Sequence, residues 1–116
     1  MVVLVINETA ILRKALRRFF ELQGYTMIEA GNFGQAYSMA IEYKPQFVLA
    51  DNLIEATLCL NFFQLLQSIP GMEMTEFVVF TDYDDEFETA ASINLKATIT
   101  KPNILPKMKE HFPDLK

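Results

Sequence analysis

Polar residues that could do chemistry stand at the ends of short apolar runs of the chain: Asn7, Glu8, Asp51, Thr81 and Lys101. Asp51 is a carboxylate that can act as a nucleophile, and two carboxylates can hold Mg²⁺ through oxygen. A lysine and a hydroxyl can neutralise and orient the equatorial oxygens of a phosphoryl group. If these side chains meet in space, the set suits transfer of a phosphoryl group to Asp51.

The elements that must position these residues alternate between two kinds. Segments of helical period separate the short apolar runs, many of them rich in β-branched residues, and this alternation predicts βα units around a parallel sheet. The predicted strands are Val2 to Ile6, Tyr25 to Ile28, Phe47 to Ala50, Phe77 to Phe80 and Ala97 to Thr100. The predicted helices follow them, with the third at Leu58 to Leu66, the fourth around Phe87 to Ile93, and a short last one bracketed by Pro106 and Pro113.

Two helices show their ends and faces in the sequence. In the first, Ile11, Ala15, Phe19 and Leu22 form one apolar row beside a second row of Leu12, Leu16 and Phe20, which predicts a wide buried face. Gly24 is expected to end that helix in the left-handed conformation, and Asn32 to cap the start of the next.

The polar residues are expected on one edge of the sheet. In open parallel sheets, ligands bind at the carboxyl ends of the strands, where the connections reverse direction. The second run contributes no residue to the set. This predicts the strand order 2-1-3-4-5, with strands one, three, four and five forming a continuous rim.

Composition limits the class of protein. The chain has 116 residues, 51% of them hydrophobic, and a net charge of -5, so we expect one packed domain over residues 1–116 without a nucleic-acid partner. Its single cysteine, Cys59, is expected in the core and indicates a reducing compartment. No run has the length of a signal peptide core or a membrane span, so the cytoplasm is the expected location, with no membrane partner.

Over its whole length the chain resembles the receiver domains of two-component response regulators. The matching features are Asn7-Glu8 with Arg13, the segment from Glu29 to Ala36, the run Pro45 to Asp51, Thr81, and Lys101-Pro102. The resemblance implies a flavodoxin-like, doubly wound (βα)5 fold. It also implies a phosphorelay function, in which a histidine kinase or phosphotransfer protein phosphorylates the domain and so changes its binding to an output domain or effector. Such a domain catalyses chemistry on itself and is not otherwise an enzyme; a second copy of the chain is a further candidate partner.

The resemblance also assigns roles by position. Asp51 matches the phosphoacceptor, with Thr81 and Lys101 as its catalytic partners, and Thr81 and Thr98 match the two switch positions. Mg²⁺ would be held by Glu8, Asp51 and the backbone carbonyl of Leu53, with Asn7 acting indirectly.

Three positions depart from the family pattern. Asn7 is neutral where an acid is usual, so weak Mg²⁺ binding is expected. Asp82 stands where a small residue is usual, so its charge is expected to slow or destabilise phosphorylation. Thr98 replaces an aromatic ring. These departures favour the alternative of a pseudo-receiver that binds partner proteins without phosphorylation.

Each motif also has a plainer interpretation. Asp51 could be a turn residue, Thr81 a helix cap and Lys101 a solvated loop residue. The basic residues of the first helix could be a solvated face or a docking surface for an acidic region of the kinase: Arg13, Lys14, Arg17 and Arg18. A mononucleotide or flavin carrier is a third alternative, but Asn7 to Ala10 is not the phosphate-binding loop that it requires.

Overall fold

A five-stranded parallel sheet forms the centre of the molecule. The computed structural model describes residues 1–54, 57–82, 93–102 and 104–115. The strands are β1 (Val2–Ile6), β2 (Thr26–Ala30), β3 (Phe47–Asp51), β6 (Glu76–Thr81) and β7 (Leu95–Thr100), in the order β2-β1-β3-β6-β7. Counted along the chain within this sheet, the order is 2-1-3-4-5, so the predicted flavodoxin-like, doubly wound fold is confirmed.

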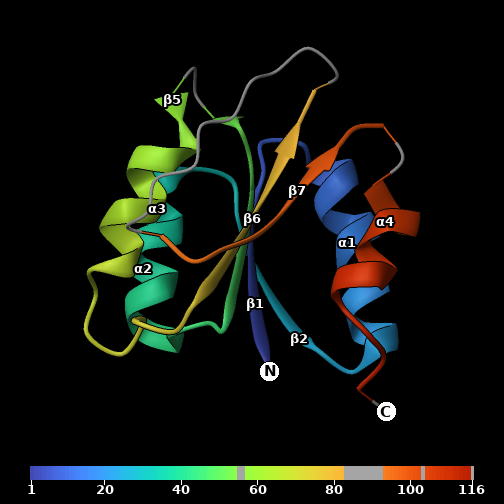
Figure 1. The fold of residues 1–116 in the computed structure, drawn as a ribbon, viewed down its shortest axis with the longest axis horizontal. Coiled ribbons are helices and arrows are strands. Elements are labelled where there is room, and N and C mark those ends of the chain that lie inside the picture. The colour runs from blue at the N-terminus through green and yellow to red at the C-terminus, as the bar shows by residue number, and fades with distance from the viewer. Residues whose placement is uncertain (55–56, 83–92, 103, 116) are drawn as a thin grey trace.

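Helices cover both faces of the sheet. Figure 1 shows α1 (Ala10–Gln23) and α4 (Ile104–His111) on one face, and α2 (Phe33–Tyr43) and α3 (Cys59–Gln67) on the other. The helix predicted around Phe87 to Ile93 falls almost wholly on residues 83–92, outside the described residues, and stays a prediction. Within the described part of the chain, no helix is long and apolar enough to cross a membrane.

A small antiparallel hairpin, not among the elements predicted from the sequence, follows β3. It pairs β4 (Leu53–Ile54) with β5 (Thr57–Leu58), and the Cys59 N–H donates to the Asn52 carbonyl at 2.9 Å across its base. Strands of two residues are too short to show a period of hydrophobicity, which is why sequence patterning missed them.

The two predicted helix ends are confirmed. Gly24 ends α1 with φ of 95°, a left-handed conformation that favours a residue without a Cβ. The Asn32 side chain caps α2 by accepting a hydrogen bond from the Gln35 N–H at 2.9 Å. These caps set the points at which β2 and α2 begin.

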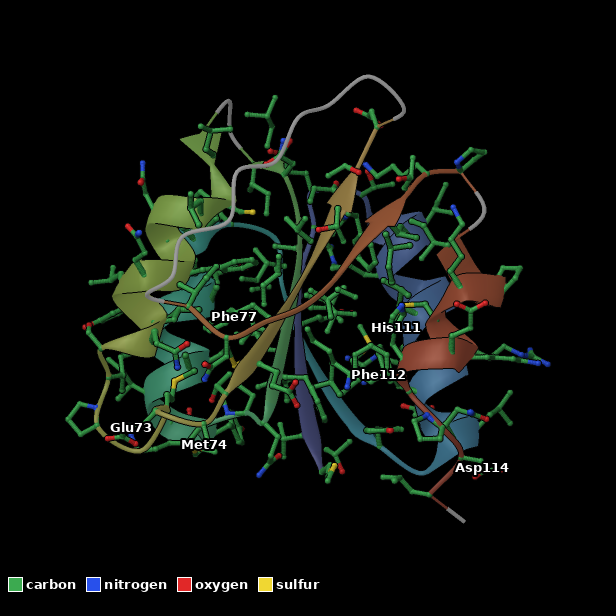
Figure 2. All side chains as sticks on the ribbon, viewed as in Figure 1. Glu73, Met74, Phe77, His111, Phe112 and Asp114 are labelled. Carbon is green, nitrogen blue, oxygen red and sulfur yellow. The ribbon has the colours of Figure 1, made fainter. Side chains whose placement is uncertain are left out.

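Each face of the sheet has its own hydrophobic core. On the α2 and α3 side, Phe63 and Phe77 stack at 4.6 Å between ring centroids. On the α1 and α4 side, Phe112 contacts Phe20 and Phe47 edge-on, each at 5.1 Å. Figure 2 shows Phe77 and Phe112 on opposite sides of the sheet, and Phe112 fastens the end of α4 to it.

The prediction of a wide buried face on α1 is wrong at its ends. Leu16, Phe19 and Phe20 are buried, but Ile11 is 83% exposed and Leu22 is 60% exposed. A helix packed on one side of a sheet buries a limited stripe, and the row from Ile11 to Leu22 runs along the edge of that stripe. Apolar side chains therefore remain on the outer surface of α1.

Candidate functional site

The predicted site residues lie at the carboxyl ends of the strands. Ile6 pairs with Ala50 in the β1–β3 register, and Thr81 pairs with Thr100 in the β6–β7 register. Because all these strands are parallel, the residues at their ends share one edge of the sheet.

Three predicted side chains contact one another at this edge. The Lys101 Nζ lies 2.9 Å from the Asp51 Oδ1, and the Asn7 Nδ2 donates to the Asp51 Oδ2 at 2.8 Å. The Asp51 side chain is 18% exposed and the Lys101 side chain 30% exposed. The Asp51 Oδ2 therefore accepts a hydrogen bond from a neutral amide, whereas the buried Oδ1 meets the Lys101 cation as an ion pair without hydrogen-bond geometry.

The local backbone fixes the Asn7 amide. Asn7 is fully buried, and its Oδ1 accepts a hydrogen bond from the Thr9 N–H at 2.7 Å. The Arg13 guanidinium donates to the Asn7 backbone carbonyl. Since a backbone N–H can face an oxygen but not an NH₂ group, the amide nitrogen must point toward Asp51.

The surroundings of Asp51 oppose its ionisation overall. Burial raises the pKa of the Asp51 carboxyl above its ordinary value, and this is the largest effect. The nearby ammonium group of Lys101 and the hydrogen bond from Asn7 act in the opposite direction, while the charge of Asp82 raises the pKa further. A partly buried carboxylate with a raised pKa is a common feature of reactive sites.

Thr81 joins this edge through its backbone. Its carbonyl accepts the Lys101 N–H at 2.8 Å, and the residue is buried. Side chains alternate along a strand, so Thr81 belongs to the same face as Val79, toward α2 and α3, and Thr98 pairs with Val79 on the neighbouring strand. Thr98 is exposed, and the roles of Thr81 and Thr98 as switch positions stay predictions.

Asp82 competes for the same lysine. Its Oδ1 lies 3.9 Å from the Lys101 Nζ, and its side chain is 73% exposed. The negative charge expected beside Asp51 is therefore present, although solvent screens most of its effect.

The residues do not fit the Mg²⁺ site that the family resemblance implies. Glu8 is exposed after β1, and no group of three or more acidic, histidine or cysteine side chains in the described ranges could hold a metal ion. Asn7 presents an N–H donor to Asp51, and a donor cannot ligate a cation. Leu53 lies in β4, and the role of its carbonyl as the third ligand stays a prediction.

Sequence reasoning did not single out the buried polar atom beside Asp51. The Asn52 Oδ1 is buried and has no hydrogen-bond partner among the described residues. Cys59 is also buried, and burial raises the pKa of its thiol to about 12, which excludes it as a nucleophile near neutral pH.

Comparison with solved structures shows that the chain has the fold of response-regulator receiver domains. No family model and no curated protein matches the chain by sequence. A CheY-like receiver domain from Methylobacillus flagellatus aligns with a TM-score of 0.83 and 14% identity, over 95% of this chain and 93% of that one. A receiver domain from Clostridium thermocellum gives 0.82 and 13%, over 96% and 90%. The response regulator domain of Thermotoga maritima CheB gives 0.74 and 20%, over 95% and 91%.

Proposed function

We propose that this chain, which has the fold of response-regulator receiver domains, is a signalling module whose partner binding is set by the state of Asp51. The observation that carries the proposal is the contact between Asp51 and Lys101 at 2.9 Å on the carboxyl edge of the sheet. It joins a nucleophile and a fixed cation at the place where open parallel sheets bind ligands.

The proposed chemistry is acceptance of a phosphoryl group by Asp51. An Asp51 carboxylate oxygen forms the new bond to phosphorus as the bond to the leaving group of a phosphorylated histidine or a small acyl phosphate breaks. Lys101 already lies against this carboxylate, so its ammonium group can move to an equatorial oxygen of the phosphoryl group and neutralise its charge. The chain is not proposed to act on any other substrate.

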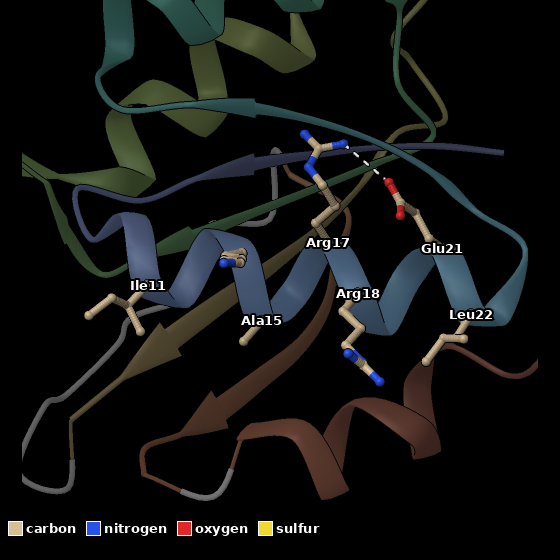
Figure 3. A pocket seen from close by; sticks show the side chains of 7 residues that line it. Ile11, Ala15, Arg17, Arg18, Glu21 and Leu22 are labelled. Carbon is tan, nitrogen blue, oxygen red and sulfur yellow. Dashed lines mark ion pairs between the residues drawn. The ribbon is translucent and has the colours of Figure 1, made fainter.

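The outer side of α1 supports a protein partner. Figure 3 shows Ile11, Ala15, Arg18 and Leu22 projecting from one side of the helix. They line a groove of about 600 Å³. A neighbouring groove of about 500 Å³ adds further residues of α1 and α4: Phe19, Leu105, Pro106 and Lys109. Apolar residues flanked by cations fit an acidic amphipathic helix, and we propose that a histidine kinase or phosphotransfer protein docks here.

The basic residues of α1 divide between two tasks. Arg17 forms ion pairs with Glu21 and Glu29, and Arg13 lies near Glu29 and holds the Asn7 carbonyl. Lys14, Arg17 and Arg18 line the outer groove. Three of the four cations therefore belong to the proposed docking face, Arg17 while it also pairs with Glu21 and Glu29, and Arg13 stabilises the fold around Asn7.

One observation favours a second candidate, a pseudo-receiver that binds partners without phosphorylation. The Asn7 amide already occupies the Asp51 Oδ2, where the family pattern has acids that attract a cation. In this alternative, the α1 surface binds a partner constitutively, and Asp51 serves to hold the edge of the sheet together.

A melting experiment distinguishes the two candidates. Beryllofluoride mimics a phosphoryl group on a carboxylate, and a ligand that binds the folded state raises its melting temperature. We expect beryllofluoride to raise the melting temperature of the native chain and of the control Glu42→Gln on the exposed side of α2, but not of Asp51→Asn. No rise in the native chain would support the phosphorylation-independent module.

A further inference from the structure

We infer that the Asn7 amide takes the place of a divalent cation at Asp51, so that the resting site of this chain is complete without metal. The inference concerns the regulation of the proposed phosphoacceptor and draws its biological meaning from that proposal. Its physical basis is the set of contacts around Asn7.

The charges around Asp51 offer little attraction to a metal ion. In the direct contacts of Asp51, one carboxylate meets one ammonium group and one neutral amide. One positive charge meets one negative charge in these contacts, and the Asp82 carboxylate, 3.9 Å from the same ammonium, is 73% exposed and largely screened by solvent. A dication at Asp51 therefore gains less electrostatic energy than it would beside two carboxylates, and it would lie close to the Lys101 ammonium. A second acid at position 7 would leave a surplus negative charge that attracts a cation.

The position of the Asn7 amide also opposes a metal ion at Asp51. A cation on the side of the Asp51 Oδ2 that faces Asn7 would have to displace the Asn7 Nδ2, which lies 2.8 Å away. Turning the amide to present its oxygen would place the NH₂ group against the Thr9 N–H, which now donates to Asn7 at 2.7 Å. Asn7 is fully buried, so this lost hydrogen bond could not be replaced by solvent.

The backbone of Asn7 is fixed in position. Arg13 donates to the Asn7 carbonyl, and Arg13 is in turn 4.0 Å from Glu29 of β2. The Asn7 N–H donates to the Ala30 carbonyl at 3.1 Å. With its backbone bonded on both sides, Asn7 cannot retreat from Asp51 to admit an ion.

The test compares Asn7 with an acid of nearly the same shape. Melting is followed for the native chain, Asn7→Asp and the control Asn61→Asp, which adds the same charge at an exposed position on α3, in metal-free buffer and in excess Mg²⁺. We expect Asn7→Asp to melt below the native chain without metal, because two carboxylates then face each other. Mg²⁺ should raise its melting temperature by about 3 °C or more and leave the native chain and the control within about 1 °C.

A direct titration keeps the inference testable if Asn7→Asp does not fold. Calorimetric titration of Mg²⁺ into the native chain should give no saturable binding at millimolar concentration, whereas submillimolar binding would overturn the inference. Equal Mg²⁺ responses of the native chain and a folded Asn7→Asp would do the same. Neither measurement uses a phosphodonor, so failure here leaves the role of Asp51 as phosphoacceptor to its own test.

Discussion

Lys101→Met removes the cation from Asp51 and measures how strongly the pair is coupled. The change keeps the length and apolar stem of the side chain and deletes the ammonium group that lies 2.9 Å from the carboxylate. Lys101 lowers the pKa of Asp51, so its loss raises that pKa further above the ordinary value. At neutral pH the variant must then keep a largely buried carboxylate with Asn7 as its remaining partner.

The magnitude follows from distance and exposure. At 2.9 Å the Coulomb energy is about 1.4 kcal/mol in water and about 5.7 kcal/mol at an effective dielectric constant of 20, before desolvation is subtracted. Breaking exposed pairs typically costs about 0.2–1 kcal/mol, and breaking buried pairs about 3–5 kcal/mol. With exposures of 18% and 30%, this pair falls between the two classes, and we expect a loss of about 1–3 kcal/mol at pH 7.

The assay is urea unfolding followed by circular dichroism, because the chain has no tryptophan. Lys109→Met, at an exposed lysine of α4, is the matched control and should change the free energy of unfolding by less than about 0.5 kcal/mol. In the Asp51→Asn background, Lys101→Met should cost almost nothing. An equal loss in both backgrounds would show that Lys101 stabilises the fold by some route other than Asp51, and would refute the electrostatic account of the site.

Three further predictions concern the charge and the core around the site. The pKa of Asp51 is raised in the folded chain, so the folded chain binds this proton more tightly than the unfolded chain does. The stability that the proton contributes is fully present below the unfolded-state pKa of about 3.9, and it is lost as the pH rises through the folded-state pKa. Asp51→Asn should therefore gain stability relative to the native chain as pH rises from about 3 to 7; urea titrations across this range would contradict this if the difference stayed constant. Asp82→Asn should lower the pKa of Asp51, measured by carboxyl NMR, and more so at low salt, whereas an unchanged titration would mean that solvent screens the charge fully. Phe112→Ala should cost about 3–5 kcal/mol of unfolding free energy, since the ring is fully buried against Phe20 and Phe47, and a loss below about 1 kcal/mol would show that α4 is held by other contacts.

The sheet could be predicted because its inner strands, β1, β3 and β6, are buried on both faces. Runs such as Val2 to Ile6 and Phe77 to Phe80 are continuously apolar, and the polar residue that ends each run marks the carboxyl edge. The contact of Asp51 with Lys101 then follows from topology, because parallel strands that are near neighbours bring their ends together. The caps at Gly24 and Asn32 could also be predicted, because each cap depends on one residue type at one position.

Other features depend on three-dimensional contacts that the sequence does not encode locally. The orientation of the Asn7 amide is set by the Thr9 N–H and by Asp51, which lies 44 positions away along the chain. The exposure of Ile11 depends on where the sheet ends beneath α1, and helical periodicity gives no information about that limit. Arg13 and Arg17 look like solvated cations in the sequence but pair with Glu29 of β2 across the edge of the sheet.

The most direct test of the central claim is whether Asp51 itself accepts a phosphoryl group. The chain would be incubated with acetyl phosphate and with a phosphorylated histidine donor, and the acyl phosphate would be trapped by borohydride reduction, which converts a phosphorylated aspartate to homoserine. Peptide mass spectrometry then locates the modified residue. We expect homoserine at position 51 in the native chain, less of it in Lys101→Met, and none in Asp51→Asn. Unmodified Asp51 with both donors, in a chain that remains folded, would contradict the claim.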